Sequence, residues 1–273
     1  MKNDVIDGFV CMHSNWVHRL PYTNTVMKNN IGTNKRVSIL IGGDITYATL
    51  FLGLLGKGMA DCYVEESSMG LISYNSICEA ISASKSTDGV LWIHGTHTSD
   101  AANMEVAQKY AHLDGIHVEA IQHPRQTIPT GKKYHAIAQE LATTLFIIKE
   151  AGAASEQGLP IEDIARIAKK VQKRSRSVSI SVLGEISPSL NCSQIDPDEK
   201  NRGLLLELNH GQDAKVRRIF SGEDLSQALL DSLCGDTLFL TPGDHVVIDI
   251  CRFDTTLSPV IFSFIRPLHE MLK

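Results

Sequence analysis

The residue with the clearest chemical potential is His210, which follows the apolar run at residues 204–208 and precedes Gly211. A histidine between a strand and a glycine is expected in a turn, where side chains reach outward. Imidazole has an unperturbed pKa of about 6.5, so a neutral histidine can act as a nucleophile near pH 7. The alternative is a histidine at the tip of a hairpin with no chemical role. This stretch alone leaves both interpretations open.

Two other patterns suggest ligand sites but are weaker. His94 and His97 have the spacing of a metal-binding pair, but no third ligand can be named for them, so we predict no metal site. Residues 56–58 contain a Gly-Lys pair, but the GxxxxGK[ST] spacing of a nucleotide-binding loop is missing and the segment follows a predicted helix rather than a strand. We therefore expect no ATP site and no cofactor.

The elements that must position these residues alternate between strands and helices in the first part of the chain. Strand patterns occur at residues 37–41, 89–94 and 116–121. Helical patterns occur at residues 45–55, 74–84, 101–113 and 133–150. Asp100 directly precedes one of these helices and can be its N-cap. Such alternation predicts an α/β sheet with some parallel pairs.

The second part of the chain has a different order of elements. We place a domain boundary after the helix predicted at residues 160–173, which gives domains at residues 1–173 and 174–273. Strand patterns follow at residues 178–183, 204–208 and 245–250, and helical patterns at residues 225–233 and 259–273. His210 belongs to this second domain, whereas Asp100 belongs to the first.

Composition excludes several classes of protein. The hydrophobic fraction of 43% and the charged fraction of 21% are typical of a globular protein. The net charge of -5 argues against direct nucleic-acid binding, and no apolar run reaches the roughly 18 residues of a membrane helix. The six cysteines form no CxxC pair and no secretory signal is visible, so we expect reduced thiols and a cytoplasmic location.

Several short motifs become specific when they are taken in order. The first three are IGG at residues 41–43, GKGM at 56–59 and GVLWI at 89–93, followed by TSD at 98–100. The others are KEAGAASEQG at 149–158, RSRS at 174–177, and NHG at 209–211 with VRR at 216–218. In this order they resemble the dihydroxyacetone kinase substrate-binding subunit family, the DhaK family. Each motif is weak alone, but the ordered set spans most of the chain.

The resemblance implies a fold, a ligand and roles for particular residues. It implies an α/β fold of two domains, each a mixed β-sheet flanked by helices, and a homodimer. It implies that His210 adds to the C2 carbonyl of dihydroxyacetone and forms a covalent hemiaminal. Asp100 matches the family's base for the hydroxyl group that receives phosphate, a role compatible with capping a helix. The substrate-binding positions that it implies are Gly42, Gly43, Asp44, Tyr47, Gly95, Asp100 and His210.

The departures from the family pattern fall on the transfer chemistry. The family loop GGGSGHEP matches residues 42–49, where Asp44 replaces a glycine and Tyr47 replaces a histidine. A tyrosine with a pKa near 10 is a poor proton shuttle at neutral pH. Gly95 occupies the position of a family lysine, so one charge is missing. Loss of one proton-transfer group costs about 10²–10⁴ in rate, so efficient kinase activity is not expected.

The chain therefore resembles the non-catalytic DhaQ coactivator branch of the family. In this interpretation it binds dihydroxyacetone through His210 and signals to a TetR-like transcription factor that activates the kinase operon. The first alternative is an active dihydroxyacetone (glycerone) kinase subunit that receives phosphate from a separate ADP-carrying subunit. The second alternative is a scaffold that has lost ligand binding because bulk at Asp44 closes the pocket.

Overall fold

A computed structural model describes most of the chain, and its residues form two compact units. The described residues are 2–29, 31, 35–43, 48–65, 72–84, 88–94, 98–122, 133–176, 178, 180–182, 204–208, 215–234, 240–250 and 258–273. The first unit is Met1–Arg125 with Thr143–Ser175, and the second is Gln126–Ala142 with Arg176–Lys273. These units assign residues 126–142 to the second body, so a single boundary after residue 173 stays a prediction.

The first unit contains a six-stranded mixed sheet in the order β1-β2-β4-β3-β5-β6. Its strands are β1 (Val17–Arg19), β2 (Thr25–Lys28), β3 (Ser38–Gly43), β4 (Cys62–Glu65), β5 (Val90–His94) and β6 (Val118–Gln122). The first two join the sheet by antiparallel pairing, whereas β4, β3, β5 and β6 are parallel to one another. The predicted α/β class is confirmed.

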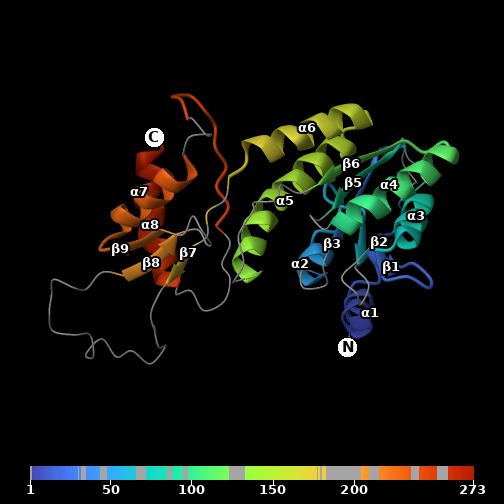
Figure 1. Cartoon of the computed structure of the whole chain (residues 1–273), viewed down its shortest axis with the longest axis horizontal. Coiled ribbons are helices and arrows are strands. Elements are labelled where there is room, and N and C mark those ends of the chain that lie inside the picture. The colour runs from blue at the N-terminus through green and yellow to red at the C-terminus, as the bar shows by residue number, and fades with distance from the viewer. Residues whose placement is uncertain are drawn as a thin grey trace. The chain divides into compact units, whose positions relative to one another are not determined.

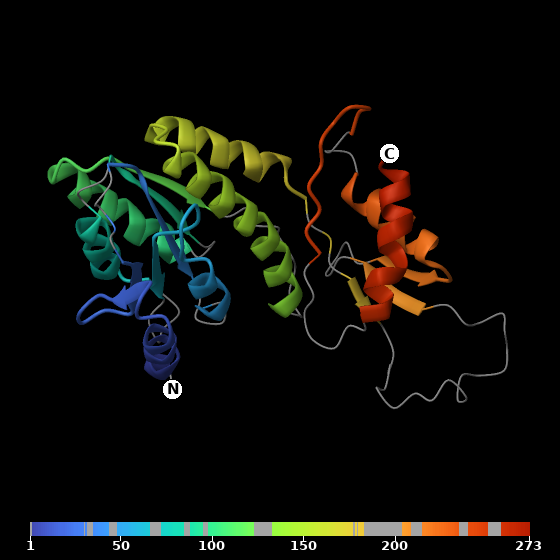
Figure 2. The ribbon, with the colours of Figure 1, turned by 180° about the vertical axis from the view of Figure 1, so that it is seen from behind.

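Helices cover both faces of this sheet (Figures 1 and 2). The helices of the first unit and its connections are α1 (Lys2–Met12), α2 (Ala48–Gly53), α3 (Tyr74–Ala83), α4 (Thr98–Leu113), α5 (Lys133–Glu156) and α6 (Ile161–Arg174). On one face Leu40, Cys62 and Trp92 pack with Ile77 of α3 and Ala107 of α4 in one buried cluster. On the other face α6 contacts β5 and β6, and Phe51 of α2 stacks on Tyr63 with ring centroids 5.9 Å apart.

A buried carboxylate joins the amino ends of the central strands. Asp61 is fully buried, and its oxygens accept hydrogen bonds from Arg36 at 2.5 and 3.0 Å and from the Ile39 N–H at 2.9 Å. Lys28 Nζ lies 2.7 Å from the same carboxylate. Burial alone would lower the pKa of the Arg36 guanidinium, but the hydrogen bond to Asp61 and the charges of Asp61 and Glu156 raise its pKa. The cations therefore keep their charge, and the buried acid is neutralised.

The same cluster fixes the C-terminal end of α5. Arg36 donates to Ser155 Oγ at 2.7 Å and lies 3.6 Å from Glu156. At Gly152 a side chain would meet the Gly58 carbonyl group and the Met59 nitrogen at 2.6 Å. Two of the ordered sequence motifs, GKGM and KEAGAASEQG, therefore touch each other. Gly152 provides the close approach between helix and loop that any larger residue would prevent.

The second unit contains a three-stranded antiparallel sheet in the order β7-β8-β9. Its strands are β7 (Ile180–Val182), β8 (Leu204–Leu208) and β9 (Lys215–Ile219), and its helices are α7 (Gly222–Leu233) and α8 (Ser258–Met271). All described pairs of this sheet are antiparallel, so the mixed pairing expected for both units is present only in the first. Ile219, Leu225, Ala228, Leu229, Phe264 and Leu268 form its apolar core.

Helices α7 and α8 pack at very close range. A Cβ at Gly222 would lie 2.0 Å from the Ser263 carbonyl oxygen, so only glycine fits at this contact. Pro267, inside α8, has no N–H to donate to the Ser263 carbonyl four residues earlier. The buried Ser226 hydroxyl donates to the Phe264 carbonyl at 2.9 Å. The proline and the glycine thus allow α7 to approach the backbone of α8.

Three predicted elements differ from the structure. Helix α4 begins at Thr98 rather than at residue 101, and α5 continues to Glu156 rather than ending at residue 150. Residues 245–250 were expected to form a strand, but residues 240–250 form neither helix nor strand, because no described strand pairs with them. None of the helices in the described parts of the chain is long and apolar enough to cross a membrane.

The Gly152 contact predicts a large effect of one methyl group. Gly152→Ala should lower the free energy of unfolding of the first unit by about 1–3 kcal/mol, because backbone on both sides must move. Urea denaturation followed by tryptophan fluorescence measures this, since both tryptophans, Trp16 and Trp92, lie in the first unit. Gly8→Ala is the matched control: Gly8 is helical with open space around it, so this change should leave stability equal or slightly higher.

The buried ion cluster predicts that one charge is required. Asp61→Asn leaves Arg36 and Lys28 without their shared buried anion, and such a loss typically costs about 3–5 kcal/mol. The exposed Arg19–Asp7 pair provides the comparison, because Asp7→Asn should cost at most about 1 kcal/mol. The same urea titration measures both variants. Equal effects of the two substitutions would contradict the role assigned to Asp61.

Candidate functional site

The four parallel strands of the first unit end along one edge of the sheet. β3 ends at Gly43 beside Glu65 of β4, and β5 ends at His94 beside Gln122 of β6. In chain order β4 follows β3 on one side, whereas β5 returns to the other side of β3. The sheet therefore has its topological switch point between β3 and β5. In open α/β sheets this is the usual place for a ligand.

The predicted site residues of the first unit follow these two strand ends in the sequence. Gly42 and Gly43 are the last residues of β3. Asp44, Tyr47 and Gly95 lie outside the described residues, so their predicted contacts stay predictions. Asp100 is the third residue of α4, because the helix begins at Thr98. The expectation that Asp100 is the N-cap is therefore wrong, although a carboxylate in the first turn still favours the helix dipole.

Gly42 has a packing role that the sequence reasoning missed. A Cβ at this position would lie 2.7 Å from Ile72 Cδ1 and 2.7 Å from the Trp92 ring. The missing side chain therefore makes room for Trp92, which stands in β5, the neighbouring strand. Glycine at residue 42 is explained by this contact alone. Any additional role of Gly42 in ligand binding stays a prediction.

Two buried polar residues at the strand ends were also not identified as site residues. Glu65 closes β4 and is 4% exposed, and His94 closes β5 and is 5% exposed. Because side chains alternate along a strand, Glu65 shares the face of Tyr63 and His94 shares the face of Trp92. The sequence signal was available, since each ends an apolar run with one ionisable residue. Their position makes them candidates for supporting a ligand at this edge.

His210 belongs to the connection of a β-hairpin in the second unit. Leu208 of β8 pairs with Lys215 of β9, and residues 209–214 connect the two strands. The sequence-based expectation of a histidine next to a strand end is therefore consistent with the pairing of the flanking strands. His210 itself lies outside the described residues. Its hydrogen bonds and its exposure are not part of the argument below.

The described residues offer no support for a metal site or a reactive thiol. They contain no group of three or more histidine, cysteine, aspartate or glutamate side chains that could hold a metal ion. His97, the partner of His94 in the metal-binding pattern, lies outside them. Complete burial and the nearby charge of Asp61 raise the pKa of the Cys62 thiol well above its usual value. Cys62 is therefore an inert core residue.

Comparisons with known proteins agree with the fold. The chain is 25% identical over 272 residues to the dihydroxyacetone-binding subunit DhaK of a PTS-dependent dihydroxyacetone kinase from Listeria innocua, which covers 98% of this chain and 81% of the relative. A structure from work on regulation of the dha operon of Lactococcus lactis superimposes with a TM-score of 0.68 at 18% identity, covering 98% of this chain and 79% of the other.

A second structural neighbour is the dihydroxyacetone kinase operon co-activator Dha-DhaQ. It superimposes with a TM-score of 0.62 at 20% identity and covers 86% of this chain and 71% of the other. At these identities the two superpositions show a common fold only. Some other curated relatives are much longer, and this chain spans 40% and 43% of the length of two of them.

The family assignment rests on a sequence model rather than on the superpositions. The model of the Dak1 domain matches residues 7–273, nearly the whole chain. The matched region includes the two motifs that contact each other at Gly58 and Gly152, and both strands that precede the predicted site loops. The chain belongs to the Dak1 domain family, and the resemblance to DhaK-like subunits is confirmed.

Proposed function

We propose that this protein binds dihydroxyacetone, or a similar small ketone, and acts as a regulatory protein rather than as an efficient kinase. His210 is the proposed covalent anchor. The observation that carries the proposal is where the chain departs from its family. The packing motifs around Gly58 and Gly152 are retained in contact, whereas the substitutions at Asp44, Tyr47 and Gly95 follow the carboxyl ends of β3 and β5.

The covalent step requires only a neutral imidazole and a carbonyl group. The lone pair of a His210 ring nitrogen attacks C2 of the ketone, and the carbonyl electrons move to oxygen. The oxygen takes up a proton and the ring loses its other N–H proton, so that N–H is added across C=O and no atom is lost. This addition is reversible and needs no metal. It selects a ketone over glycerol, which has no electrophilic carbon.

Phosphoryl transfer has stricter requirements than this addition. It depends on positioning and on stabilisation of charge that develops in the transition state. Tyr47 cannot replace a histidine as a proton carrier at neutral pH, and Gly95 supplies no positive charge. Asp100 remains as a possible base in the first turn of α4. A protein that retains the anchor and lacks the transfer groups fits ligand sensing better than turnover.

Two comparisons support the direction of this proposal. The Listeria relative is named as a dihydroxyacetone-binding subunit, which favours the ligand class. The structural neighbours include an operon co-activator and a protein from a study of operon regulation, which favours a regulatory role on the same fold. We propose a TetR-like transcriptional activator as the protein partner. The homodimer, the cytoplasmic location and the absence of direct nucleic-acid binding also stay predictions.

The anchor predicts a tetrahedral carbon on the ligand. With dihydroxyacetone labelled with ¹³C at C2, binding should move the carbonyl resonance from the ketone region to that of an sp³ carbon, and native mass spectrometry should show one adduct per chain. His210→Ala should remove both signals. His269→Ala is the control, because His269 is an exposed histidine of the same unit. Glycerol should give no adduct.

Absence of an adduct on the unmodified protein would favour the alternative of a scaffold that has lost ligand binding. An adduct that persists in His210→Ala would show that another nucleophile is used. Both results would overturn the proposed anchor.

The regulatory interpretation predicts very slow phosphorylation. With an ADP-carrying phosphoryl-donor subunit supplied, turnover of dihydroxyacetone should be lower by about 10² or more than that of an active kinase subunit, in line with loss of a proton-transfer group. Tyr47→His with Gly95→Lys should raise the rate if the missing groups limit it. Turnover at the rate of an active subunit would instead establish the alternative, a working glycerone kinase subunit.

A further inference from the structure

Residues 245–250, His-Val-Val-Ile-Asp-Ile, form an apolar segment on the surface of the second unit. The exposed fraction is 79% for Val247 and 44%, 46% and 40% for Val246, Ile248 and Ile250. Exposure thus alternates with the period of two that is typical of a β-strand. Valine and isoleucine are also the residues that strands prefer. The segment has the composition and the alternation of a strand but pairs with no described strand.

The beginning of this segment is held by a turn. Asp244 Oδ2 accepts hydrogen bonds from the Thr241 N–H at 2.8 Å and from the Thr241 hydroxyl at 2.9 Å. Gly243, at φ 96°, provides the left-handed conformation within this turn. The Asp244 carboxylate is therefore turned back toward Thr241. The residues available for pairing begin at His245.

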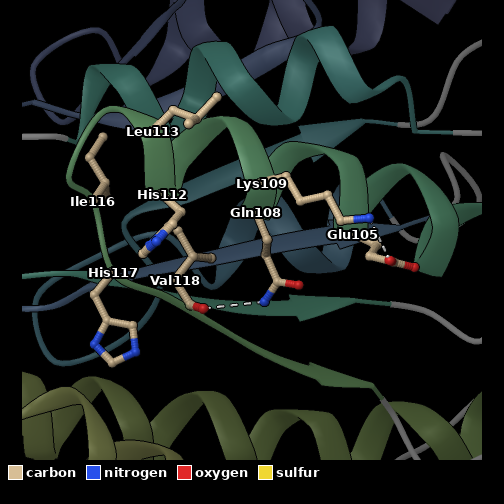
Figure 3. Close-up of a pocket in the computed structure, with 8 residues that line it drawn as sticks. All are labelled: Glu105, Gln108, Lys109, His112, Leu113, Ile116, His117 and Val118. Atoms are coloured by element: carbon tan, nitrogen blue, oxygen red, sulfur yellow. Dashed lines mark hydrogen bonds and ion pairs between the residues drawn. The ribbon is translucent and has the colours of Figure 1, made fainter.

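A true edge strand elsewhere in the chain shows how this protein protects unpaired backbone. At β6, the side-chain amide of Gln108 donates to the Val118 carbonyl at 3.2 Å (Figure 3), and Gln172 donates to the Gln122 carbonyl. Glu119 and Lys169 add charges beside the same strand. Amide caps and charges of this kind discourage pairing with another chain. Residues 245–250 contain no lysine and no proline, and no glutamine cap to them is present among the described residues.

We propose that residues His245–Asp249 form an antiparallel β-ladder with the same residues of a second copy of this chain. The register is centred on Val247, which lies opposite its own counterpart. His245 of each copy then lies opposite Asp249 of the other, and Val246 lies opposite Ile248. The interface is isologous, the kind found in two-fold symmetric dimers.

The side chains themselves select this register. One face combines Val246 and Ile248 from both copies, so that apolar residues meet apolar residues. The other face places Val247 against Val247, between two pairs of opposite charge when His245 is protonated, and cross-strand pairs of both kinds stabilise a ladder. A shift that centres the ladder on Ile248 would place the Asp249 carboxylate opposite Val247. A shift that centres it on Val246 would place Asp244 opposite Ile248.

Cysteine cross-linking tests both the partner and the register. The starting protein carries serine at Cys11, Cys78, Cys192, Cys234 and Cys251, which leaves only the buried Cys62. Val247→Cys should then form a disulfide-linked dimer under mild oxidation, because the two Val247 positions lie opposite each other. Val246→Cys alone and Ile248→Cys alone should cross-link at least about tenfold more slowly, because their own counterparts are out of reach. An equal mixture of these two variants should give the linked heterodimer.

Sedimentation of the unmodified chain gives an independent measurement. Its mass should rise from the 30.0 kDa of one chain to twice that value with increasing concentration. Val247→Lys should abolish this rise, whereas Leu240→Lys, an exposed apolar residue outside the ladder, should not. A chain that stays monomeric at all concentrations, or single-cysteine variants that cross-link at equal rates, would overturn the proposal. Neither measurement involves the ketone, so the result is independent of the proposed function.

Discussion

The structure of the first unit depends on neutralising one buried carboxylate. Asp61 stands at the amino end of the parallel sheet, where its backbone pairs with Ile39 and its side chain contacts Arg36 and Lys28. An unpaired charge at a fully buried position would be strongly unfavourable, so both cations must be present for β3 and β4 to lie side by side. Arg36 also binds Ser155, and through it α5 is attached to the sheet.

The two edges of the sheet therefore have separate tasks. The amino edge holds the structure together through the ion cluster and the Gly58–Gly152 contact. The carboxyl edge carries the positions at which ligand chemistry can vary, following β3 and β5. Substitutions at Asp44, Tyr47 and Gly95 can thus change activity without disturbing the contacts on which folding depends. This separation explains how a family fold can be retained while its transfer chemistry is lost.

The sequence predicted the α/β class and most helices and strands of the first unit because apolar periodicity follows local backbone geometry. It could not predict that Gly42 accommodates Trp92, or that Gly152 touches Gly58, since these contacts join distant segments. It identified His210 and Asp100 through motifs, but missed Glu65 and His94, whose burial depends on the sheet around them. The strand expected at residues 245–250 shows the limit of such patterns, because a strand exists only with a pairing partner.

The contact between Arg36 and Ser155 has a consequence for the order of folding. It joins residues 119 positions apart in the chain, one of the longest separations among the described hydrogen bonds. Closing so long a loop has a large entropic cost, and contacts of this kind slow folding. Pairing of Arg36 with Asp61 spans only 25 positions and can form earlier. The C-terminal end of α5 therefore docks late in folding, onto a charge cluster already in place, and is the first part of this core to detach on unfolding.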